Sequence, residues 1–442
     1  MAPRFFVETL GCPKNAVDSD KVVASLLADG LSPVDRPEDA DLVVVNTCAF
    51  VEAARQESID TALALADVKR PGARLVVTGC MAERYGDELA AALPEADSVV
   101  GFAGEGRISE VVLRGRKPTG VRDLLELPRP VSSTPWAYVK VAEGCDRACA
   151  FCAIPSFRGK QRSRSIDSIV AEVRGLVDGG VTEIVLVAQD LAWYGRDVGE
   201  PGSLAPLLRR LDELAPLGLA RVRLLYLYPS EVRDPLLATM LELETVVPYF
   251  DLSLQHASAP LLRSMKRWGS GDRFAELIGR IRATEPEAAF RSSFIVGFPG
   301  ETEGDHDELL GFLRATRLDW AGFFPFSPED GTPAATLDDH IPADLVADRL
   351  RECSELQDPI TQDARDALVG ETVEVLVDGR DDESGAVVGR THREAPEIDG
   401  LVRVSGASFA RPGARVSAVV TGAEGPDLVA RATAPSAVRE AS

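Results

Sequence analysis

The sequence predicts a multidomain α/β protein in three parts: a small doubly wound α/β domain, a partial (βα)6 barrel of TIM type, and a C-terminal antiparallel β-barrel that is OB-like. Three observations support this prediction. Short β-rich runs alternate with helical patterns over most of the 442 residues, a Pro- and Ser-rich stretch interrupts the alternation, and strands of period two dominate the C-terminal part. We therefore expect five segments: residues 1–125, a linker at 126–135, residues 136–366, residues 367–436 and a tail at 437–442.

The first segment has three β-rich runs, at residues 5–9, 42–46 and 74–78. The second and third runs are almost continuously apolar, as is typical of parallel strands that are buried on both faces. Apolar residues recur at helical spacing between the runs, in residues 17–27 and 59–65. This alternation predicts a doubly wound domain, in which ligands bind beyond the carboxyl ends of the strands.

A cysteine follows each of these three runs: Cys12, Cys48 and Cys80. Because the carboxyl ends of parallel strands meet at one edge of a sheet, we expect the three thiols to converge. Glycine precedes Cys12 and Cys80, and it permits a tight turn and the close approach of a bulky ligand. Three buried structural cysteines are one interpretation; a cluster site with three thiolate ligands is the more economical one.

The second segment contains six expected strands separated by helical patterns such as residues 166–177 and 270–284. The expected strands are residues 137–141, 183–188, 221–227, 249–254, 289–296 and 320–324. Chemistry in a barrel of this type takes place at the carboxyl ends of the strands. We therefore expect the functional residues to lie directly after these runs.

A loop with three closely spaced thiols, Cys145, Cys149 and Cys152, follows the first barrel strand. Thiolates are the usual ligands of iron-sulfur clusters, so three of them can hold three irons of a 4Fe-4S cluster and leave the fourth without a protein ligand. A structural zinc site needs a fourth ligand nearby, whereas the next histidine in the chain is His256. Zinc and a purely structural loop are the weaker interpretations.

Other polar residues end barrel strands. Gln189 closes the second strand, where its carboxamide can bind a cofactor or form part of a polar rim, and His256, which ends the fourth, is typical of a structural histidine. In the third segment, strands are expected at residues 372–377, 386–390, 400–404, 415–420 and 428–432. Residues 371–442 carry twelve acidic residues against eight Arg, and Phe409 is their one aromatic residue, which argues against RNA binding by this barrel.

Composition narrows the function classes further. The net charge is −22, with 70 acidic residues against 48 Lys and Arg, so nucleic-acid backbones are disfavoured and cationic partners are favoured. The first residues lack a secretory signal, and no run is long and apolar enough to span a membrane. We expect a cytoplasmic monomer, in which the seven cysteines serve as ligands or free thiols.

The CxxxCxxC loop, with Phe151 before its third cysteine, resembles the radical S-adenosylmethionine superfamily. With Cys12, Cys48, Cys80 and the C-terminal barrel, the whole chain resembles the methylthiotransferases. That resemblance implies two 4Fe-4S clusters, an auxiliary one on the N-terminal trio and a cofactor-binding one on the loop, with S-adenosylmethionine near Phe151 and Gln189. It also implies a TRAM domain at the C-terminus, and an electron donor and a sulfur donor as partners.

Within that family, residues 11–15 (Gly-Cys-Pro-Lys-Asn) resemble the RimO type. This likeness implies methylthiolation of the β-carbon of an aspartate in the small-subunit ribosomal protein twelve, a basic protein that an acidic surface would attract. One alternative is a tRNA adenosine 2-methylthiotransferase of the MiaB type, and another is a non-catalytic iron-sulfur or zinc module that binds RNA. We hypothesise that one basic residue binds the target carboxylate; the candidates are Lys14, Arg158, Lys160, Arg162 and Arg164.

Overall fold

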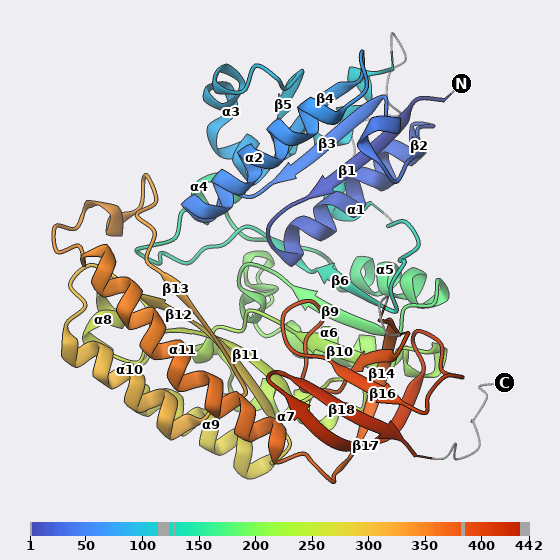
Figure 1. Cartoon of the computed structure of the whole chain (residues 1–442). Coiled ribbons are helices and arrows are strands. Elements are labelled where there is room, and N and C mark those ends of the chain that lie inside the picture. Colours follow the sequence, from blue (N-terminus) through green and yellow to red (C-terminus); the bar gives the residue numbers. More distant parts are fainter. Residues whose placement is uncertain (1, 114–122, 128, 382–384, 434–442) are drawn as a thin grey trace.

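The computed structural model describes residues 2–113, 123–127, 129–381 and 385–433, and Figure 1 shows three parts that follow one another along the chain. The N-terminal α/β domain, blue in Figure 1, packs on the barrel in the middle of the chain. The red C-terminal barrel packs on another side of it. The expected tail at 437–442 lies outside the described residues.

The N-terminal domain is built on a parallel five-stranded sheet of order β2-β1-β3-β4-β5. Alternate residues of the central strands face opposite cores: Val44 packs with Val22 and Leu26, whereas Val43 packs with Leu65. Helices therefore cover both faces, which confirms the doubly wound prediction. The strands are β1 (Arg4–Thr9), β2 (Ser32–Pro33), β3 (Leu42–Thr47), β4 (Arg74–Gly79) and β5 (Ser98–Val100), and the helices are α1 (Pro13–Ala28), α2 (Glu52–Val68) and α3 (Cys80–Ala92).

The middle of the chain forms six parallel strands in two three-stranded sheets, of order β10-β9-β6 and β11-β12-β13. Isolated parallel bridges, Val222 with Val246 and Leu227 with Leu252, connect β10 to the segment around β11. The strands run in chain order around a partial barrel, as predicted. They are β6 (Trp136–Lys140), β9 (Glu183–Val187), β10 (Arg221–Leu224), β11 (Tyr249–Gln255), β12 (Ala289–Val296) and β13 (Trp320–Pro325).

Helices follow the barrel strands and bury their apolar sides in one continuous core, which includes Leu207, Phe274 and Leu313. Cys353 is fully buried in this core, where it packs as an ordinary apolar side chain. The helices are α4 (Ile154–Arg158), α5 (Ile166–Asp178), α6 (Leu204–Asp212), α7 (Asp234–Glu242), α8 (Ala259–Ser264), α9 (Gly271–Thr284), α10 (Glu303–Thr316) and α11 (Ala343–Asp366). None of the helices in the described part of the chain is both long and apolar enough to cross a membrane.

Short 3-10 helices complete the first two domains: η1 (Pro37–Asp39), η2 (Phe102–Val111), η3 (Leu124–Glu126), η4 (Leu191–Trp193), η5 (Arg196–Val198), η6 (Ala215–Leu217), η7 (Pro229–Glu231) and η8 (Pro333–Thr336). A two-stranded antiparallel ribbon joins β7 (Ala142–Glu143) to β8 (Arg162–Ser163). The sequence pattern did not indicate this ribbon, because strands of two residues are too short to show a period.

The C-terminal part is a closed five-stranded barrel of order β14-β15-β16-β18-β17. Its strands are β14 (Thr372–Arg380), β15 (Val387–Arg390), β16 (Val402–Ser405), β17 (Arg415–Glu424) and β18 (Asp427–Ala432). The prediction of a wholly antiparallel barrel is wrong in one pair, because β16 and β18 are parallel. The chain crosses to β17 beside β14 before β18 closes the barrel against β16, and turn residues carry no information about such a non-local pairing.

The loop between β15 and β16 attaches this barrel to the middle domain. Backbone carbonyls of Pro396 and Arg393 accept hydrogen bonds from Tyr138 Oη at 3.0 Å and Trp320 Nε1 at 2.7 Å. Ala395 is fully buried in a cluster that includes residues of β6, β9 and β11. The C-terminal barrel is therefore fixed to the barrel strands through a buried polar and apolar interface.

Candidate active site

The three N-terminal cysteines lie at the carboxyl edge of adjacent parallel strands. Cys12 follows β1 and caps α1, Cys48 follows β3, and Cys80 follows β4 as the first residue of α3. The register pairs β1 with β3 and β3 with β4 up to their last residues. The structure thus brings the three loops to one edge, as the sequence predicted.

Two glycines allow these loops to pack closely. Gly11 has a φ of +90°, and a Cβ atom there would lie 2.8 Å from Cys48 Cβ. Gly79 has a φ of +89°, and a Cβ atom there would lie 2.2 Å from Asn46 Oδ1. Any larger residue would force the cysteine loops apart, because real Cβ atoms do not approach so closely.

Asn15, in the first turn of α1, connects the three cysteine loops. Its Nδ2 donates hydrogen bonds to Leu10 O at 2.9 Å and to Thr47 O at 3.0 Å. Its Oδ1 lies 3.5 Å from Cys80 Sγ. The side chain is completely buried. Sequence reasoning did not assign Asn15 a role; its position three residues after Cys12 was the available signal.

Charge and burial act differently on the three thiols. Burial raises the pKa of Cys12, but the positive charges of Lys14 and Arg158, together with the backbone N–H groups of Asn15 and Lys14, lower it below its ordinary value. Burial raises the pKa of Cys48 and raises that of Cys80 to about 12 although Arg158 opposes the shift. Metal binding displaces a thiol proton, so the cationic surroundings favour thiolate ligation at this edge.

The second cysteine trio lies in a closed loop between β6 and α5. The β7–β8 ribbon joins the base of the loop, and Cys145 N donates to Gly159 O at 3.1 Å. Gly144 has a φ of +77°, and a Cβ atom there would lie 2.1 Å from Lys160 O. Only glycine therefore allows the two ends of the loop to meet at this point.

Two further segments hold the middle of this loop. Ala150 N donates to Met265 O, and Ala150 O accepts from Ala334 N, both at 2.9 Å. Phe151 is partly buried against the barrel core. These contacts fix the backbone between Cys149 and Cys152 before any ligand binds, which is the preorganisation that a cluster site needs.

The sulfur atoms of this loop also have hydrogen-bond donors. Arg147 N donates to Cys145 Sγ and Arg267 Nη1 donates to Cys149 Sγ, each at 3.4 Å. Burial raises the pKa of Cys145 to about 11 and that of Cys152 to about 12. Donors of this kind stabilise thiolates and influence the potential of a ligated cluster.

Polar side chains at the barrel mouth face the loop. Gln189 Nε2 donates to Glu143 Oε1 at 2.8 Å, whereas Gln189 Oε1 is buried without a partner among the described residues. Asp190 pairs with Arg147 at 2.6 Å, and the guanidinium of Arg147 lies 4.0 Å from the ring centre of Trp193. A buried acceptor without a donor is costly, so Gln189 is suited to a ligand that supplies an N–H or O–H group.

The five basic candidates have different surroundings. Arg158 is buried and pairs with carboxylates, as does Arg164, and Arg162 pairs with an exposed aspartate. Lys160 is exposed. Lys14 is buried, makes no ion pair with any residue that the structure describes, and places its Nζ 3.5 Å from the ring centre of Tyr226 at the end of β10.

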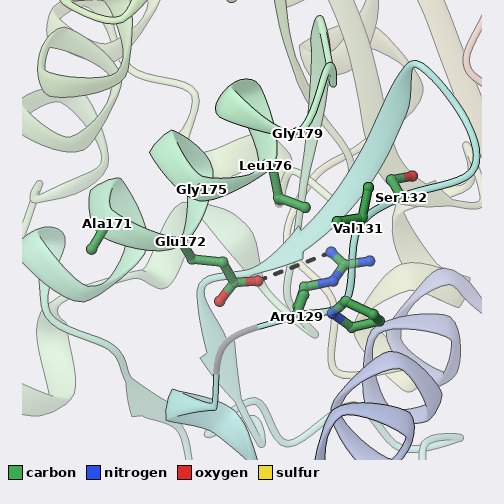
Figure 2. A pocket seen from close by; sticks show the side chains of 9 residues that line it. Arg129, Val131, Ser132, Ala171, Glu172, Gly175, Leu176 and Gly179 are labelled. Carbon is green, nitrogen blue, oxygen red and sulfur yellow. Dashed lines mark ion pairs between the residues drawn. The ribbon is translucent and has the colours of Figure 1, made fainter. Parts of the chain in front are cut away.

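A small pocket of about 130 Å³ lies elsewhere, between the linker and α5. Figure 2 shows Arg129 and Val131 of the linker beside Glu172 and Leu176 of α5, with an ion pair of 4.0 Å between Arg129 and Glu172. Sites for small molecules usually exceed roughly 300 Å³, and none of the lining residues belongs to a cysteine loop. This pocket is not the cofactor site.

The two cysteine trios have donor sets that can be compared with known metal sites. Among the residues that the structure describes, no three Cys, His, Asp or Glu side chains are placed to hold one metal ion. In a cubane cluster each thiolate binds a different iron, so the thiols need not converge on one point. Three thiols with N–H donors to their sulfur atoms fit the ligands of a 4Fe-4S cluster.

Three known families match successive parts of the chain. Residues 4–101 match an uncharacterized protein family (UPF0004), residues 139–313 match the Radical SAM superfamily, and residues 369–433 match the TRAM domain. The ribosomal protein uS12 methylthiotransferase RimO of Streptomyces coelicolor is 43% identical over 96% of this chain and 95% of its own length. The chain belongs to the RimO family.

Other relatives agree with this assignment. RimO of Kineococcus radiotolerans is 43% identical over 96% of each chain, and RimO of an Anaeromyxobacter species is 41% identical over 100% of this chain and 96% of its own. Among solved structures, the radical S-adenosylmethionine methyltransferase TsrM of Kitasatospora setae, with cobalamin and a [4Fe-4S] cluster bound, covers 76% of this chain and 77% of its own with a TM-score of 0.54. At 15% identity this likeness shows the fold alone.

Proposed function

We propose that this RimO-family protein transfers a methylthio group to the β-carbon of an aspartate in ribosomal protein uS12. The proposal rests on two cysteine trios, each of which lies on closely packed loops. The chain that carries them matches RimO relatives over nearly its whole length. The acidic chain, of net charge −22, suits a basic protein substrate better than the tRNA of the alternative hypothesis.

Each trio would hold one 4Fe-4S cluster: Cys12, Cys48 and Cys80 the auxiliary one, and the loop cysteines the one that binds S-adenosylmethionine. When bound, these groups supply hydrogen-atom abstraction from carbon and the sulfur that is transferred. The protein's own residues position them. Gln189 Oε1 would accept a hydrogen bond from the cofactor. The backbone around Phe151, which hydrogen bonds hold to two other segments, would help to exclude water from the site.

Lys14 is the residue that we propose to bind the target carboxylate. Arg158 and Arg164 already pair with carboxylates, whereas Lys14 is buried without such a partner among the described residues. Its Nζ lies over the ring of Tyr226, which has an uncommon φ of +62° at a barrel strand end. Strain of this kind is retained at functional sites, and an unpaired buried ammonium gains most from an incoming carboxylate.

Intact-mass measurement of the small-subunit ribosomal proteins tests the proposed function. Deletion of the gene should leave uS12 lighter by one methylthio group, and the wild-type gene should restore the mass. The variants Cys80→Ala and Cys149→Ala should each fail to restore it, whereas Cys353→Ala, a thiol buried in the barrel core, should succeed. An unchanged uS12 mass in the deletion strain would refute the proposal, and a loss of 2-methylthio-adenosine would support the tRNA alternative.

Iron and sulfide analysis tests the proposed cofactors independently. Two cubane clusters require about eight irons per chain, and removal of either trio should halve that number. Bound zinc, or iron that survives the loss of all six cysteines, would contradict the assignment.

A further inference from the structure

Arg158 connects the two cysteine trios through direct contacts. It is the last residue of α4 and follows Cys152 by six positions, in the loop between β6 and α5 that carries the second trio and is called the cofactor loop below. Its guanidinium nevertheless reaches the N-terminal domain. Nε and Nη2 donate to Cys80 Sγ at 3.3 and 3.0 Å, and Nη2 donates to Asn15 Oδ1 at 2.7 Å. A side chain of the cofactor loop thus donates hydrogen bonds to a sulfur atom of the N-terminal trio.

Two partly buried carboxylates hold this guanidinium in place. Arg158 Nη1 donates to both oxygens of Glu143, at 2.9 and 3.0 Å, and Nη1 and Nη2 each lie 3.1 Å from Asp18 Oδ2. Its side chain is only 3% exposed. The same two carboxylates also pair with the buried Lys140. Because the carboxylates, the two cations and Cys80 form one network of contacts, a change in charge at any member alters the field at the others.

Glu143 extends the connection to the barrel mouth. It lies two residues before Cys145, and its Oε1 also accepts a hydrogen bond from Gln189 Nε2 at 2.8 Å. The opposite atom of that amide, Gln189 Oε1, is buried and has no partner among the described residues. A chain of hydrogen bonds therefore runs from Cys80 through Arg158 and Glu143 to the free acceptor of Gln189.

We propose that Arg158 is a positioning residue that couples the auxiliary site to occupancy of the cofactor site. This inference rests on the proposed function, because it requires a cluster on each trio. N–H donors to a ligating thiolate favour the reduced state of a cluster and raise its potential. A ligand that donates to Gln189 Oε1 fixes the amide and changes the hydrogen bonding of Glu143, and Arg158 transmits this change to Cys80.

The first experiment measures the auxiliary cluster alone. The triple variant Cys145→Ala, Cys149→Ala, Cys152→Ala retains only the N-terminal trio, and its cluster is titrated potentiometrically with and without Arg158→Lys. Lysine keeps the charge but not the forked donors, so we expect the equilibrium for reduction to fall on the order of tenfold, about 59 mV. The control Arg162→Lys, at an exposed position, should leave the reduction potential of the auxiliary cluster unchanged. An equal potential with and without Arg158→Lys would overturn the inference.

The second experiment measures the coupling in the complete protein. S-adenosylmethionine should change the electron paramagnetic resonance signal of the reduced auxiliary cluster in the wild type and in Arg162→Lys, and it should leave that signal unchanged in Arg158→Lys. An identical cofactor-induced change in Arg158→Lys would refute the coupling while both clusters stay in place. If the N-terminal trio bound no iron at all, the proposed function itself would fail, so the two failures are distinguishable.

Discussion

Replacement of Asn15 by alanine should destabilise the auxiliary cysteine edge specifically. The amide donates to Leu10 O and Thr47 O and accepts from Arg158, and it is completely buried. Asn15→Ala leaves two carbonyls and one guanidinium donor without this partner. At about 1 kcal/mol for each carbonyl and about 2 kcal/mol for the charged donor, the loss is about 4 kcal/mol.

That free energy applies to local opening of the loops, because Asn15 ties the segments after β1 and β3 together. At 1.4 kcal/mol for each tenfold change, 4 kcal/mol raises the population of opened loops by up to about 10³-fold. Release of auxiliary iron to a chelator under anaerobic conditions should accelerate accordingly. Iron on the cofactor loop should be released at the wild-type rate, because Asn15 contacts Arg158 beyond that loop's cysteines and makes no hydrogen bond to the described Cys145, Cys149 or Cys152.

Two variants control this experiment. Gln362→Ala removes another side-chain amide, one that bonds an exposed aspartate on α11, and it should not change iron release. Asn15→Asp keeps the acceptor for Arg158 and removes both donors, so iron release should still accelerate. If Asn15→Ala released its auxiliary iron within twofold of the wild-type rate, the inference that this amide holds the cysteine loops together would be wrong.

Three further predictions follow. Lys14→Met should raise the KM for uS12 by about 10–100-fold, which corresponds to the loss of one charged hydrogen bond. It should not change uncoupled cofactor cleavage at the loop cysteines. The exposed Lys160→Met should leave the KM unchanged, and equal KM values for Lys14→Met and the wild type would refute the assignment. Gly144→Ala should prevent closure of the cofactor loop, because its Cβ would lie 2.1 Å from a carbonyl oxygen. The iron content of this variant should be half that of the wild type. In the control Gly175→Ala, the new Cβ has no neighbouring atom within 4 Å, so this variant should retain all its iron. For Glu183, burial raises the pKa but neighbouring guanidiniums lower it to about 2. The ionised carboxylate therefore stabilises the fold by about 3 kcal/mol above pH 4.5, and this stabilisation is lost as the pH falls towards 2. The free energies of unfolding of Glu183→Gln and the wild type, measured by urea titration, should converge over that range, and a constant difference would contradict this prediction.

The sequence allowed the positions of the cysteines to be predicted because they depend on local signals. Apolar runs marked β3 and β4 within one residue, and a thiol directly after a parallel strand must lie at the carboxyl edge. Gly79 before Cys80 indicated a tight turn, and its φ of +89° agrees. These inferences needed only the chain within a few residues of each cysteine.

The contacts that connect the trios could not be predicted in this way. Arg158 was one of several basic residues in a short run, and nothing local distinguishes it from the exposed Lys160 two positions later. Its partner Asn15 is 143 positions away, so the contact depends on how two domains pack. A run of basic residues in an acidic chain usually forms a solvated face, but Arg158 and Arg164 are buried and pair with carboxylates.

The boundaries expected at residues 125 and 367 separate patterns of secondary structure, but the packing crosses both of them. One buried cluster combines Val17 of α1, Tyr249 of β11 and Ala395 of the C-terminal barrel. A six-stranded partial barrel leaves its interior uncovered on one side, and here the two flanking domains supply apolar side chains that cover it. The α1 helix that begins with the Cys12 loop is therefore held against the barrel by the same cluster as the C-terminal barrel. A mutation at the β15–β16 loop can thus move the N-terminal trio relative to the cofactor loop, because both pack on one core.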